Sequence, residues 1–178
     1  MKNVLVISSS LRKNSNSETL AKEFMRGAES SGNNVEFISL QDKEIKFCKG
    51  CLACQNTQSC VIKDDSNAIV EKMKNADVIA FATPIYYYEM SGQLKTLLDR
   101  GNPLFSSDYK FRDIYFITSA ADTDIHTMDY AIGGIQGWIA CFSQCSLKGV
   151  IKGLGLTNAG DVNGSEYIAE AYNMGKNI

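Results

Sequence analysis

The feature that most constrains this fold is a regular alternation between short apolar runs and stretches of helical periodicity. Residues 4–7 form an uninterrupted apolar run, which is typical of a parallel strand covered on both faces. Residues 18–31 instead place apolar side chains at helical spacing. Because right-handed crossovers put helices on both faces of a sheet, the alternation predicts an α/β fold with a doubly wound parallel sheet. We expect strands at residues 4–7, 35–40, 76–82, 114–118 and 150–156, and helices at 18–31, 65–74, 92–100, 129–142 and 165–174.

Length and composition fit one globular domain. The chain has 178 residues, of which 44% are hydrophobic and 21% charged, so we expect a single domain over residues 1–178. Its net charge of −2 gives no general attraction to nucleic acid or to anionic lipid. The run at residues 4–7 is too short for a signal peptide, and no run reaches the length of a membrane span, so we expect a cytoplasmic protein.

The loop after the first strand, residues 8–17, is rich in hydrogen-bond donors; we call it the phosphate loop. It contains five serines together with Arg12 and Lys13, and it leads directly into a helix. The N-terminus of a helix offers unpaired N–H groups and a partial positive charge, which favour a phosphate. Neither a dinucleotide fingerprint nor a P-loop is present, so a terminal phosphomonoester, such as that of FMN, fits best. The alternative is a polar turn with a serine cap.

Three consecutive tyrosines at positions 86–88 follow the third strand, where ligands of such sheets bind. Flat aromatic rings and the nearby Met90 suit the face of an isoalloxazine ring. A subunit interface, which is also enriched in tyrosine and methionine, is the alternative. After the fourth strand, Ser119 and Ala120 are small and allow close approach of the backbone to the pyrimidine edge of the ring.

Four cysteines lie in one short segment with the spacing C-x2-C-x2-C-x5-C, inside a loop that spans residues 46–64. In a cytoplasmic protein, thiols stay reduced, and such a group indicates metal binding or catalysis more than a disulfide. The spacing favours an iron–sulfur cluster over zinc, because zinc ribbons use two separated pairs of cysteines. Free or disulfide-forming thiols are the remaining alternative. The cysteines of this loop are Cys48, Cys51, Cys54 and Cys60.

Together these segments resemble the flavodoxin-like NAD(P)H-dependent FMN reductases. The most specific parts are Pro-Ile-Tyr at residues 84–86, Met-Ser-Gly-Gln-Leu-Lys at residues 90–95 and Leu-Asp-Arg at residues 98–100. Within that family, the cysteine spacing is similar to the compact motif of the iron–sulfur flavoproteins. The resemblance implies a flavodoxin-like three-layer sandwich with a five-stranded parallel sheet in the order 2-1-3-4-5, and a homodimer or homotetramer.

The resemblance also implies three groups of site residues: contacts to the FMN phosphate, contacts to the ribityl chain and ring, and cluster ligands. The phosphate contacts are Ser10, Arg12, Ser15, Asn16 and Ser17, beside Ser8 at the start of the loop. The ring and ribityl contacts are Pro84, Ile85, Tyr86 and Tyr87. The ligands of a [4Fe–4S] cluster are Cys48, Cys51, Cys54 and Cys60.

The resulting prediction is an FMN-dependent oxidoreductase that passes electrons from NAD(P)H through FMN to a small-molecule or protein acceptor. One alternative is an iron–sulfur flavoprotein that relays single electrons between a ferredoxin-like donor, a [4Fe–4S] cluster and FMN. The other is a non-enzymatic module for redox sensing or interaction. No side chain is expected to be catalytic, because the flavin performs the chemistry, and His126 is interpreted as a loop residue.

Overall fold

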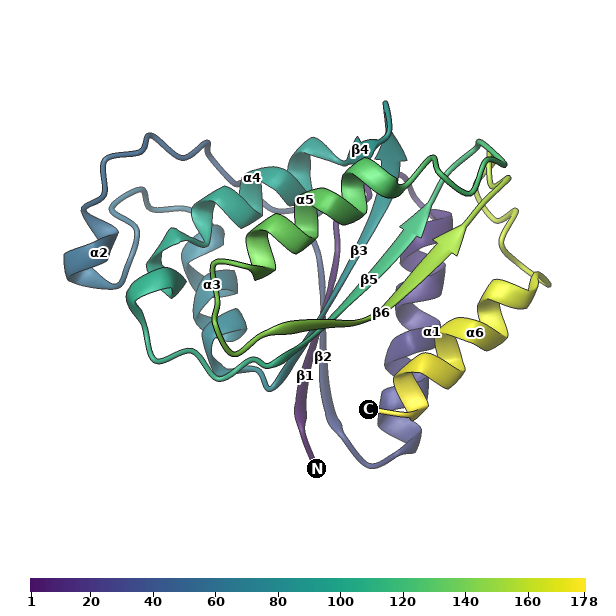
Figure 1. The fold of residues 1–178 in the computed structure, drawn as a ribbon, viewed down its shortest axis with the longest axis horizontal. Helices are drawn as coiled ribbons and strands as arrows, with labels where there is room; N and C mark the ends of the chain where they lie inside the picture. Colours follow the sequence, from purple (N-terminus) through teal and green to yellow (C-terminus); the bar gives the residue numbers. More distant parts are fainter.

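The computed structural model describes residues 1–178 as a parallel sheet between two layers of helices (Figure 1). The strands are β1 (Asn3–Ser8), β2 (Asn34–Ser39), β3 (Val78–Tyr86), β4 (Glu89–Met90), β5 (Asp113–Ser119) and β6 (Ser146–Gly153). The main sheet has the order β2-β1-β3-β5-β6, and every neighbouring pair in it is parallel. The predicted flavodoxin-like order 2-1-3-4-5 is therefore confirmed, with β4 as a short addition that pairs only with β3.

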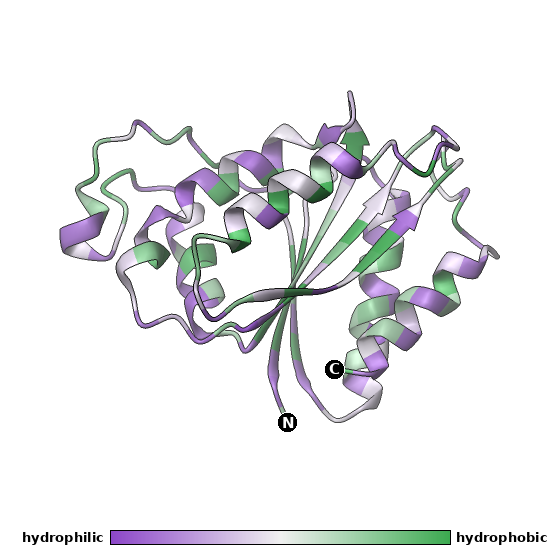
Figure 2. Cartoon of the chain, in the orientation of Figure 1, coloured by the Kyte–Doolittle hydropathy of each residue, from purple (hydrophilic) through white to green (hydrophobic).

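Helices cover both faces of the sheet and divide the core in two. The helices are α1 (Asn16–Ser30), α2 (Cys54–Thr57), α3 (Ser66–Asn75), α4 (Gly92–Arg100), α5 (Asp129–Ile139) and α6 (Glu166–Lys176). Val4 and Val6 of β1 join the core under α1 and α6, whereas Leu5 and Ile7 join the core under α3, α4 and α5. Burial on both faces explains the continuous apolar runs, which appear in Figure 2 as green stretches within the strands. None of the helices combines the length and apolar character needed to cross a membrane.

Helices α1 and α6 pack closely because each contributes a glycine to the contact. A Cβ atom added to Gly27 would lie 2.0 Å from the carbonyl oxygen of Tyr172, and one added to Gly175 would lie 2.0 Å from that of Phe24. No side chain fits at either position, so the two backbones approach each other directly. This contact holds the C-terminal helix against α1, the helix that begins at the phosphate loop (Figure 1).

All predicted strands and helices are present, but some of their ends differ. Strand β3 runs past residue 82 to Tyr86, because its end forms an antiparallel pair with β4. Strand β6 occupies Ser146–Gly153 instead of residues 150–156, because β5 pairs with its polar first half and tertiary pairing overrides local propensity. Helix α5 ends at Ile139 instead of residue 142. Helix α2 and a 3₁₀ turn at Asn102–Ser106 were not predicted.

Candidate functional site

Three loops leave neighbouring strands at the carboxyl edge of the sheet, toward the top of Figure 1. Strand β3 lies between β1 and β5, and the registers place Ser8 beside Ala82 and Pro84 beside Ser119. The loops are the phosphate loop, the segment 84–90 that we call the tyrosine hairpin, and the loop after β5. Ligands of doubly wound sheets bind at this edge. The structure thus brings together the segments that the sequence singled out.

Two buried hydroxyl groups of the phosphate loop have no partner. The Oγ atoms of Ser8 and Ser17 make no hydrogen bond, although both side chains are fully buried. Ser15 caps α1, since its Oγ accepts a hydrogen bond from the N–H of Glu18 at 3.3 Å. Buried hydroxyls in proteins nearly always have partners. Two unpartnered ones, with Ser17 in the first turn of a helix, fit an anionic ligand such as a phosphate.

Two other residues predicted to bind phosphate also hold the neighbouring loop in place. The side-chain amide of Asn16 donates to two backbone carbonyls and accepts from two backbone N–H groups, all within residues 156–162. Arg12 is exposed, and its Nη1 donates to a carbonyl of the same loop at 2.9 Å. The Oγ of Ser10 accepts from the N–H of Arg12 at 3.3 Å. The amide of Asn16 is therefore fully used within the protein, while the guanidinium of Arg12 stays at the rim of the loop.

The tyrosine hairpin has a strained turn that presents aromatic rings to solvent. Tyr86 pairs with Glu89, so Tyr87 and Tyr88 form a two-residue turn. Their φ angles are 50° and 68°. Type I′ turns need positive φ at both positions, but bulky side chains rarely adopt it. Because Tyr87 is 99% exposed, its ring is available to a ligand or a second molecule and contributes nothing to the core.

The remaining predicted ring contacts lie at the ends of β3 and β5. Pro84 and Ile85 are half-buried, whereas Ser119 and Ala120 are buried. Backbone hydrogen bonds to β6 and to the segment after it hold Ala120 in position. These four residues lie at the adjacent ends of β3 and β5, where Pro84 pairs with Ser119, and we call them the floor of the site. The predicted contacts are thus close in the structure.

His126 lies exposed in the loop between β5 and α5. Its Nδ1 is 2.8 Å from Oδ2 of Asp129, and Lys152 pairs with the other carboxylate oxygen at 3.3 Å. Hydrogen bonds from His126 and Lys152 lower the pKa of the Asp129 carboxyl below its usual range. This is a surface ion-pair group at the start of α5, in agreement with the interpretation of His126 as a loop residue.

The four cysteines of the loop at residues 46–64, the cysteine loop, all line the same cavity. Cys54 is buried, Cys60 is half-buried, and Cys48 and Cys51 are exposed; all four are free thiols. No three His, Cys, Asp or Glu side chains of the structure are grouped closely enough to hold a metal ion. The fold therefore gathers the predicted ligands around one cavity, with the thiols spread over its wall.

The surroundings of this cavity suit negatively charged sulfur. The N–H of Gly50 donates to Sγ of Cys48 at 3.5 Å, and Nδ2 of Asn102 donates to Sγ of Cys54 at 3.0 Å. Hydrogen bonds to sulfur are a regular feature of thiolate-bound clusters. Four thiols on one cavity also match the ligand number of a [4Fe–4S] cluster. The kind and number of donors therefore fit such a cluster, although the thiols stand too far apart in this structure to share one metal ion.

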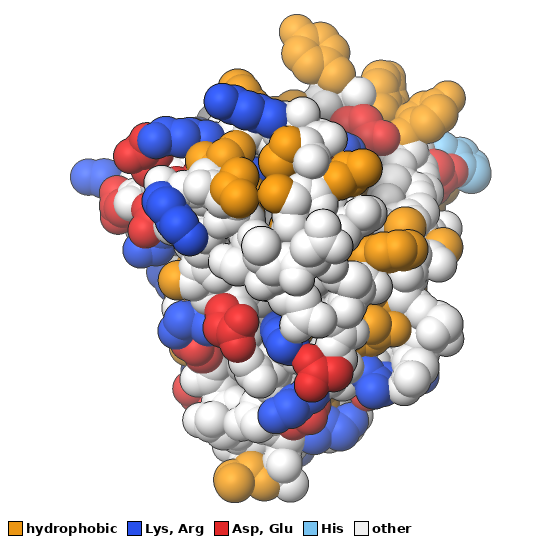
Figure 3. Space-filling model, turned by 90° about the vertical axis from the view of Figure 1, so that its left-hand side faces the viewer, with side chains coloured by type: hydrophobic (Ala, Val, Ile, Leu, Met, Phe, Trp, Pro, Cys, Tyr) orange, Lys and Arg blue, Asp and Glu red, His pale blue; other side chains and the backbone are white.

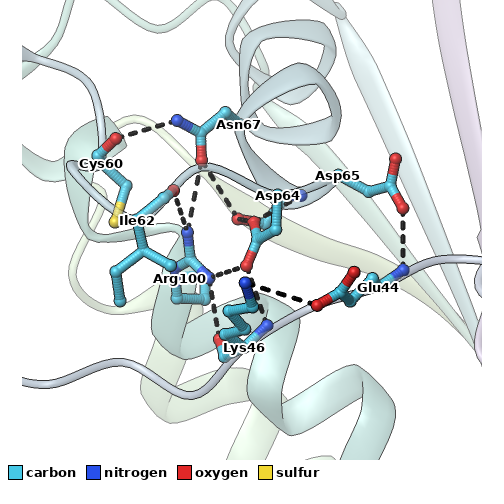
Figure 4. Close-up of polar contacts among 9 residues, drawn as sticks. Glu44, Lys46, Cys60, Ile62, Asp64, Asp65, Asn67 and Arg100 are labelled. Atoms are coloured by element: carbon cyan, nitrogen blue, oxygen red, sulfur yellow. Dashed lines mark hydrogen bonds and ion pairs between the residues drawn. The ribbon is translucent and has the colours of Figure 1, made fainter.

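A buried arginine connects the two ends of the cysteine loop (Figure 4). Arg100, the last residue of α4, is 1% exposed. Its Nη1 donates to the carbonyl of Lys46 at 2.8 Å and to Oδ2 of Asp64 at 2.5 Å. Its Nη2 donates to the carbonyl of Ile62 at 3.0 Å and to Oδ1 of Asn67 at 3.3 Å. The remaining donor, Nε, is buried and has no partner.

Both members of the Arg100–Asp64 pair are charged. Burial acts to raise the pKa of the Asp64 carboxyl, but hydrogen bonds from Arg100, Lys46 and Ser66 outweigh it and lower the pKa to about 2. Burial acts to lower the pKa of Arg100, but the hydrogen bond with Asp64 and the adjacent Cys60 thiol raise it. A buried pair of this kind is retained only where further hydrogen bonds satisfy both partners.

The roles of Arg100 and Asp64 were not predicted from the sequence. Asp64 was expected only to end the loop at residues 46–64, and Arg100 belonged only to the segment that carries the family resemblance. A signal was available, because Arg100 follows Leu97 at helical spacing and so occupies a core position of α4. A charged residue on the buried face of a helix indicates a buried partner.

Exposed apolar side chains gather at the cysteine loop and at the tyrosine hairpin. Figure 3 shows hydrophobic side chains on the upper part of the face that carries the cysteine loop. Patches of this kind mark sites of interaction. Those of the cysteine loop and the adjacent 3₁₀ turn are Phe47, Leu52, Val61 and Phe105. Those near the hairpin are Tyr86, Tyr87, Tyr88 and Tyr130.

Comparison of sequences finds similar proteins. Residues 2–128 match the family model described as NADPH-dependent FMN reductase. An iron-sulfur flavoprotein of Methanocaldococcus jannaschii is 43% identical over 101 residues, which cover 57% of this chain and 52% of that protein. An iron-sulfur flavoprotein of Methanosarcina thermophila is 38% identical over 94 residues, which cover 53% of this chain and 49% of that protein. The chain thus spans about half the length of these curated relatives.

Comparison of structures finds the same fold at low sequence identity. An NAD(P)H:quinone oxidoreductase from Methanothermobacter marburgensis matches with a TM-score of 0.74 and 16% identity, over 99% of this chain and 95% of that one. An azoreductase from Bacillus anthracis matches with a TM-score of 0.74 and 13% identity, over the full length of both chains. At these identities the likeness supports the architecture alone.

Proposed function

The chain belongs to the NADPH-dependent FMN reductase family, and on that premise we propose that it is an FMN-dependent oxidoreductase acting as a single FMN-binding domain. NAD(P)H is the electron donor, and a small molecule or a protein is the acceptor. The observation that carries this proposal is the pair of buried, unpartnered hydroxyls in the phosphate loop. When bound, FMN supplies the redox chemistry, since it accepts hydride from a reduced nicotinamide and passes the electrons on.

In this proposal the phosphate loop binds the terminal phosphate of FMN. Ser8 and Ser17 donate their free hydroxyls, and the first-turn N–H groups of α1 add backbone donors and the positive end of the helix. Arg12 contributes a positive charge at the exposed rim. Asn16 contributes by holding residues 156–162 against the loop.

The tyrosine hairpin and the floor beside it orient the ring. Tyr86 and Tyr87 offer aromatic faces for stacking, and the half-buried Pro84 and Ile85 support the ribityl chain. Beside them, β5 ends at the buried Ser119, which is followed by the buried Ala120, and in this proposal their backbone lies along the ring edge. Hydride transfer would require a nicotinamide close to the bound flavin, and the exposed Tyr86 and Tyr87 leave this side of the proposed site accessible to it.

The test is a cofactor assay on protein purified without oxygen. We expect stoichiometric FMN in the purified protein, and loss of the flavin absorbance within seconds after NADH or NADPH is added. A colourless protein that stays empty when offered FMN would contradict the proposal. It would also favour the alternative of a non-enzymatic module.

A second function, the relay of single electrons through a [4Fe–4S] cluster, is favoured by the four thiols that line one cavity. Cys48, Cys51, Cys54 and Cys60 would be the ligands, and the cluster would supply one-electron chemistry beside FMN. Iron and acid-labile sulfide, measured in the same anaerobic sample, should each be present at about four per chain if this function holds. Stoichiometric FMN without iron would leave the reductase function alone.

We also propose a homodimer or homotetramer. The support is the exposed group of Tyr86, Tyr87 and Tyr88 at the mouth of the flavin site, which one subunit leaves uncovered. Sedimentation analysis of the FMN-loaded protein tests this, and a monomer at micromolar concentration would contradict it.

A further inference from the structure

The two ends of the cysteine loop are held together by one side chain. Lys46 precedes the first cysteine and Ile62 follows the last, and the backbone carbonyls of both accept hydrogen bonds from Arg100. Asp64 fixes the guanidinium through a bond to Nη1, and the N–H of Lys46 donates to the same carboxylate. The loop is therefore closed at its base by a charged pair whose side chains are 0% and 1% exposed.

The same arginine lies at the cavity of the four cysteines. Arg100 lines the cavity with all four cysteines. Figure 4 shows the sulfur of Cys60 beside the guanidinium, and the Nε donor of Arg100 is buried without a partner. Asn67 supports this arrangement, because its Nδ2 donates to the carbonyl of Cys60 at 2.9 Å while its Oδ1 accepts from Arg100. A buried unpartnered donor beside a sulfur indicates that the site is built for a charged sulfur ligand.

We propose that Arg100, fixed by Asp64, is the positioning residue of the cysteine cavity. It closes the base of the loop so that the four thiols face one cavity, and its Nε–H is the hydrogen-bond donor for the sulfur of Cys60. This inference deepens the cluster-binding function proposed above and rests on it for its iron-dependent tests. The closing of the loop can also be tested without a cluster.

The tests use five variants of the full chain. Arg100→Met removes the guanidinium with its N–H donors and its charge. Arg100→Lys keeps the charge but cannot bridge the carbonyls of Lys46 and Ile62. Asp64→Asn keeps an acceptor but removes the negative charge. Arg100→Met combined with Asp64→Asn avoids a lone buried carboxylate, which by itself can unfold a protein. Arg26→Met is the matched control, because Arg26 forms only an exposed pair on α1.

Folding and flavin binding are checked first in every variant. Melting curves report on the fold and FMN content reports on the flavin site, which uses other residues, and we expect FMN content equal to that of the unchanged protein. If every variant and the unchanged protein all lack FMN, the proposed flavin binding is contradicted, and the proposal on Arg100 is not. Loss of FMN from the Arg100 variants alone, at unchanged melting temperature, would overturn a role confined to the cysteine cavity.

The first readout is thiol access in protein stripped of metal. Cys54 and Cys60 are alkylated with iodoacetamide and quantified by mass spectrometry. We expect about tenfold faster alkylation in Arg100→Met, Arg100→Lys and the double variant, because their loop opens more often. Rates equal to those of Arg26→Met in all three would overturn the proposal, whether or not the unchanged protein holds iron.

The second readout is the cluster itself. Loss of iron to a chelator should be about tenfold faster in Arg100→Met and Arg100→Lys, as for other outer-shell substitutions. The midpoint potential of the cluster should fall in Arg100→Met, which removes a positive charge and an N–H donor, and rise in Asp64→Asn, which removes a negative charge. If the midpoint potentials of Arg100→Met and Asp64→Asn shift in the same direction, or do not shift, the placement of Nε–H at the Cys60 sulfur is overturned. An unchanged protein without iron and sulfide would instead overturn the cluster function.

Discussion

The hydroxyl of Ser17 is buried in the first turn of α1 and makes no hydrogen bond within the protein. An unpartnered buried hydroxyl costs stability unless a ligand completes it. Its neighbour Ser15 has its hydroxyl used as the helix cap. Removing the Ser15 hydroxyl would therefore destabilise the start of α1, whereas removing the Ser17 hydroxyl breaks no hydrogen bond within the protein.

Ser17→Ala should weaken FMN binding by about tenfold or more, because a hydrogen bond to a charged phosphate contributes roughly 1.5–3 kcal/mol. The FMN-free protein should become somewhat more stable, since no hydrogen bond is lost there and an unpartnered buried hydroxyl is removed. Titration followed by flavin fluorescence measures the affinity, and urea unfolding measures the stability. Ser30→Ala is the control, because Ser30 lies at the other end of α1 and bonds only to the carbonyl of Gly27. Equal affinity in the Ser17 variant and this control would contradict a phosphate contact.

The depressed pKa of Asp64 predicts a pH dependence of stability. Its value is about 2 in the folded protein against an ordinary 3.8. The unfolded chain therefore binds more protons at low pH, and the stabilisation of about 2 kcal/mol is present above about pH 4 and is lost as pH falls toward 2. The unchanged protein should therefore have a higher unfolding free energy than Asp64→Asn at about pH 4 and above. This difference should shrink as the pH is lowered from about 4 to about 2. In the control Asp108→Asn the difference should stay small at every pH, because Asp108 belongs to an exposed pair.

Among the elements, the tyrosine hairpin departs most from its local preferences. Two tyrosines occupy turn positions that favour Asn-Gly, and both have positive φ. Strain of this kind is found where function requires a particular side chain. The hairpin is therefore less stable than the same turn with Asn-Gly would be, and it exposes two aromatic rings.

Replacing the turn with Tyr87→Asn and Tyr88→Gly should raise the unfolding free energy by about 1–2 kcal/mol, because the new residues adopt positive φ without strain. The same variant should bind FMN more weakly if the rings contact the flavin. Urea unfolding and flavin titration measure the two effects. Tyr130→Asn removes another exposed tyrosine from a helix and should not stabilise the protein. A stabilised variant with unchanged FMN affinity would remove the hairpin from the flavin site.

At the scale of the whole molecule, the contact between α1 and α6 joins the end of the chain to its beginning. Gly27→Ala should destabilise the protein by about 2–3 kcal/mol, because the added methyl group meets a backbone carbonyl that cannot move alone. Gly137→Ala is the matched control, since nothing lies within 4 Å of its added Cβ, and better helix propensity should stabilise it by about 0.5–1 kcal/mol. Urea unfolding compares the two. Equal stabilities would contradict the close packing of these helices.

The order of strands and helices, the two-faced core and the loops at the carboxyl edge were predictable from the sequence. Apolar periodicity reports on burial directly, and chirality limits how strands and helices connect. Helix α4 begins at the predicted residue 92, because the Oγ of Ser91 before it accepts a hydrogen bond from the N–H of Leu94 at 3.4 Å. The end of β3 was not predictable, since its last residues are held by a partner strand.

The sequence by itself determined which residues are the candidates for a functional site: the serines of the phosphate loop, the tyrosines and the four cysteines. Only the tertiary structure decided which of them keep a free polar group and what holds them in place. Ser17 is unpartnered and the side chain of Asn16 is fully used, although they are adjacent. Arg100 and Asp64 are 36 positions apart in the chain and meet at the base of the cysteine loop. Hydrogen bonds between distant segments depend on packing, and no local pattern in the sequence encodes their geometry.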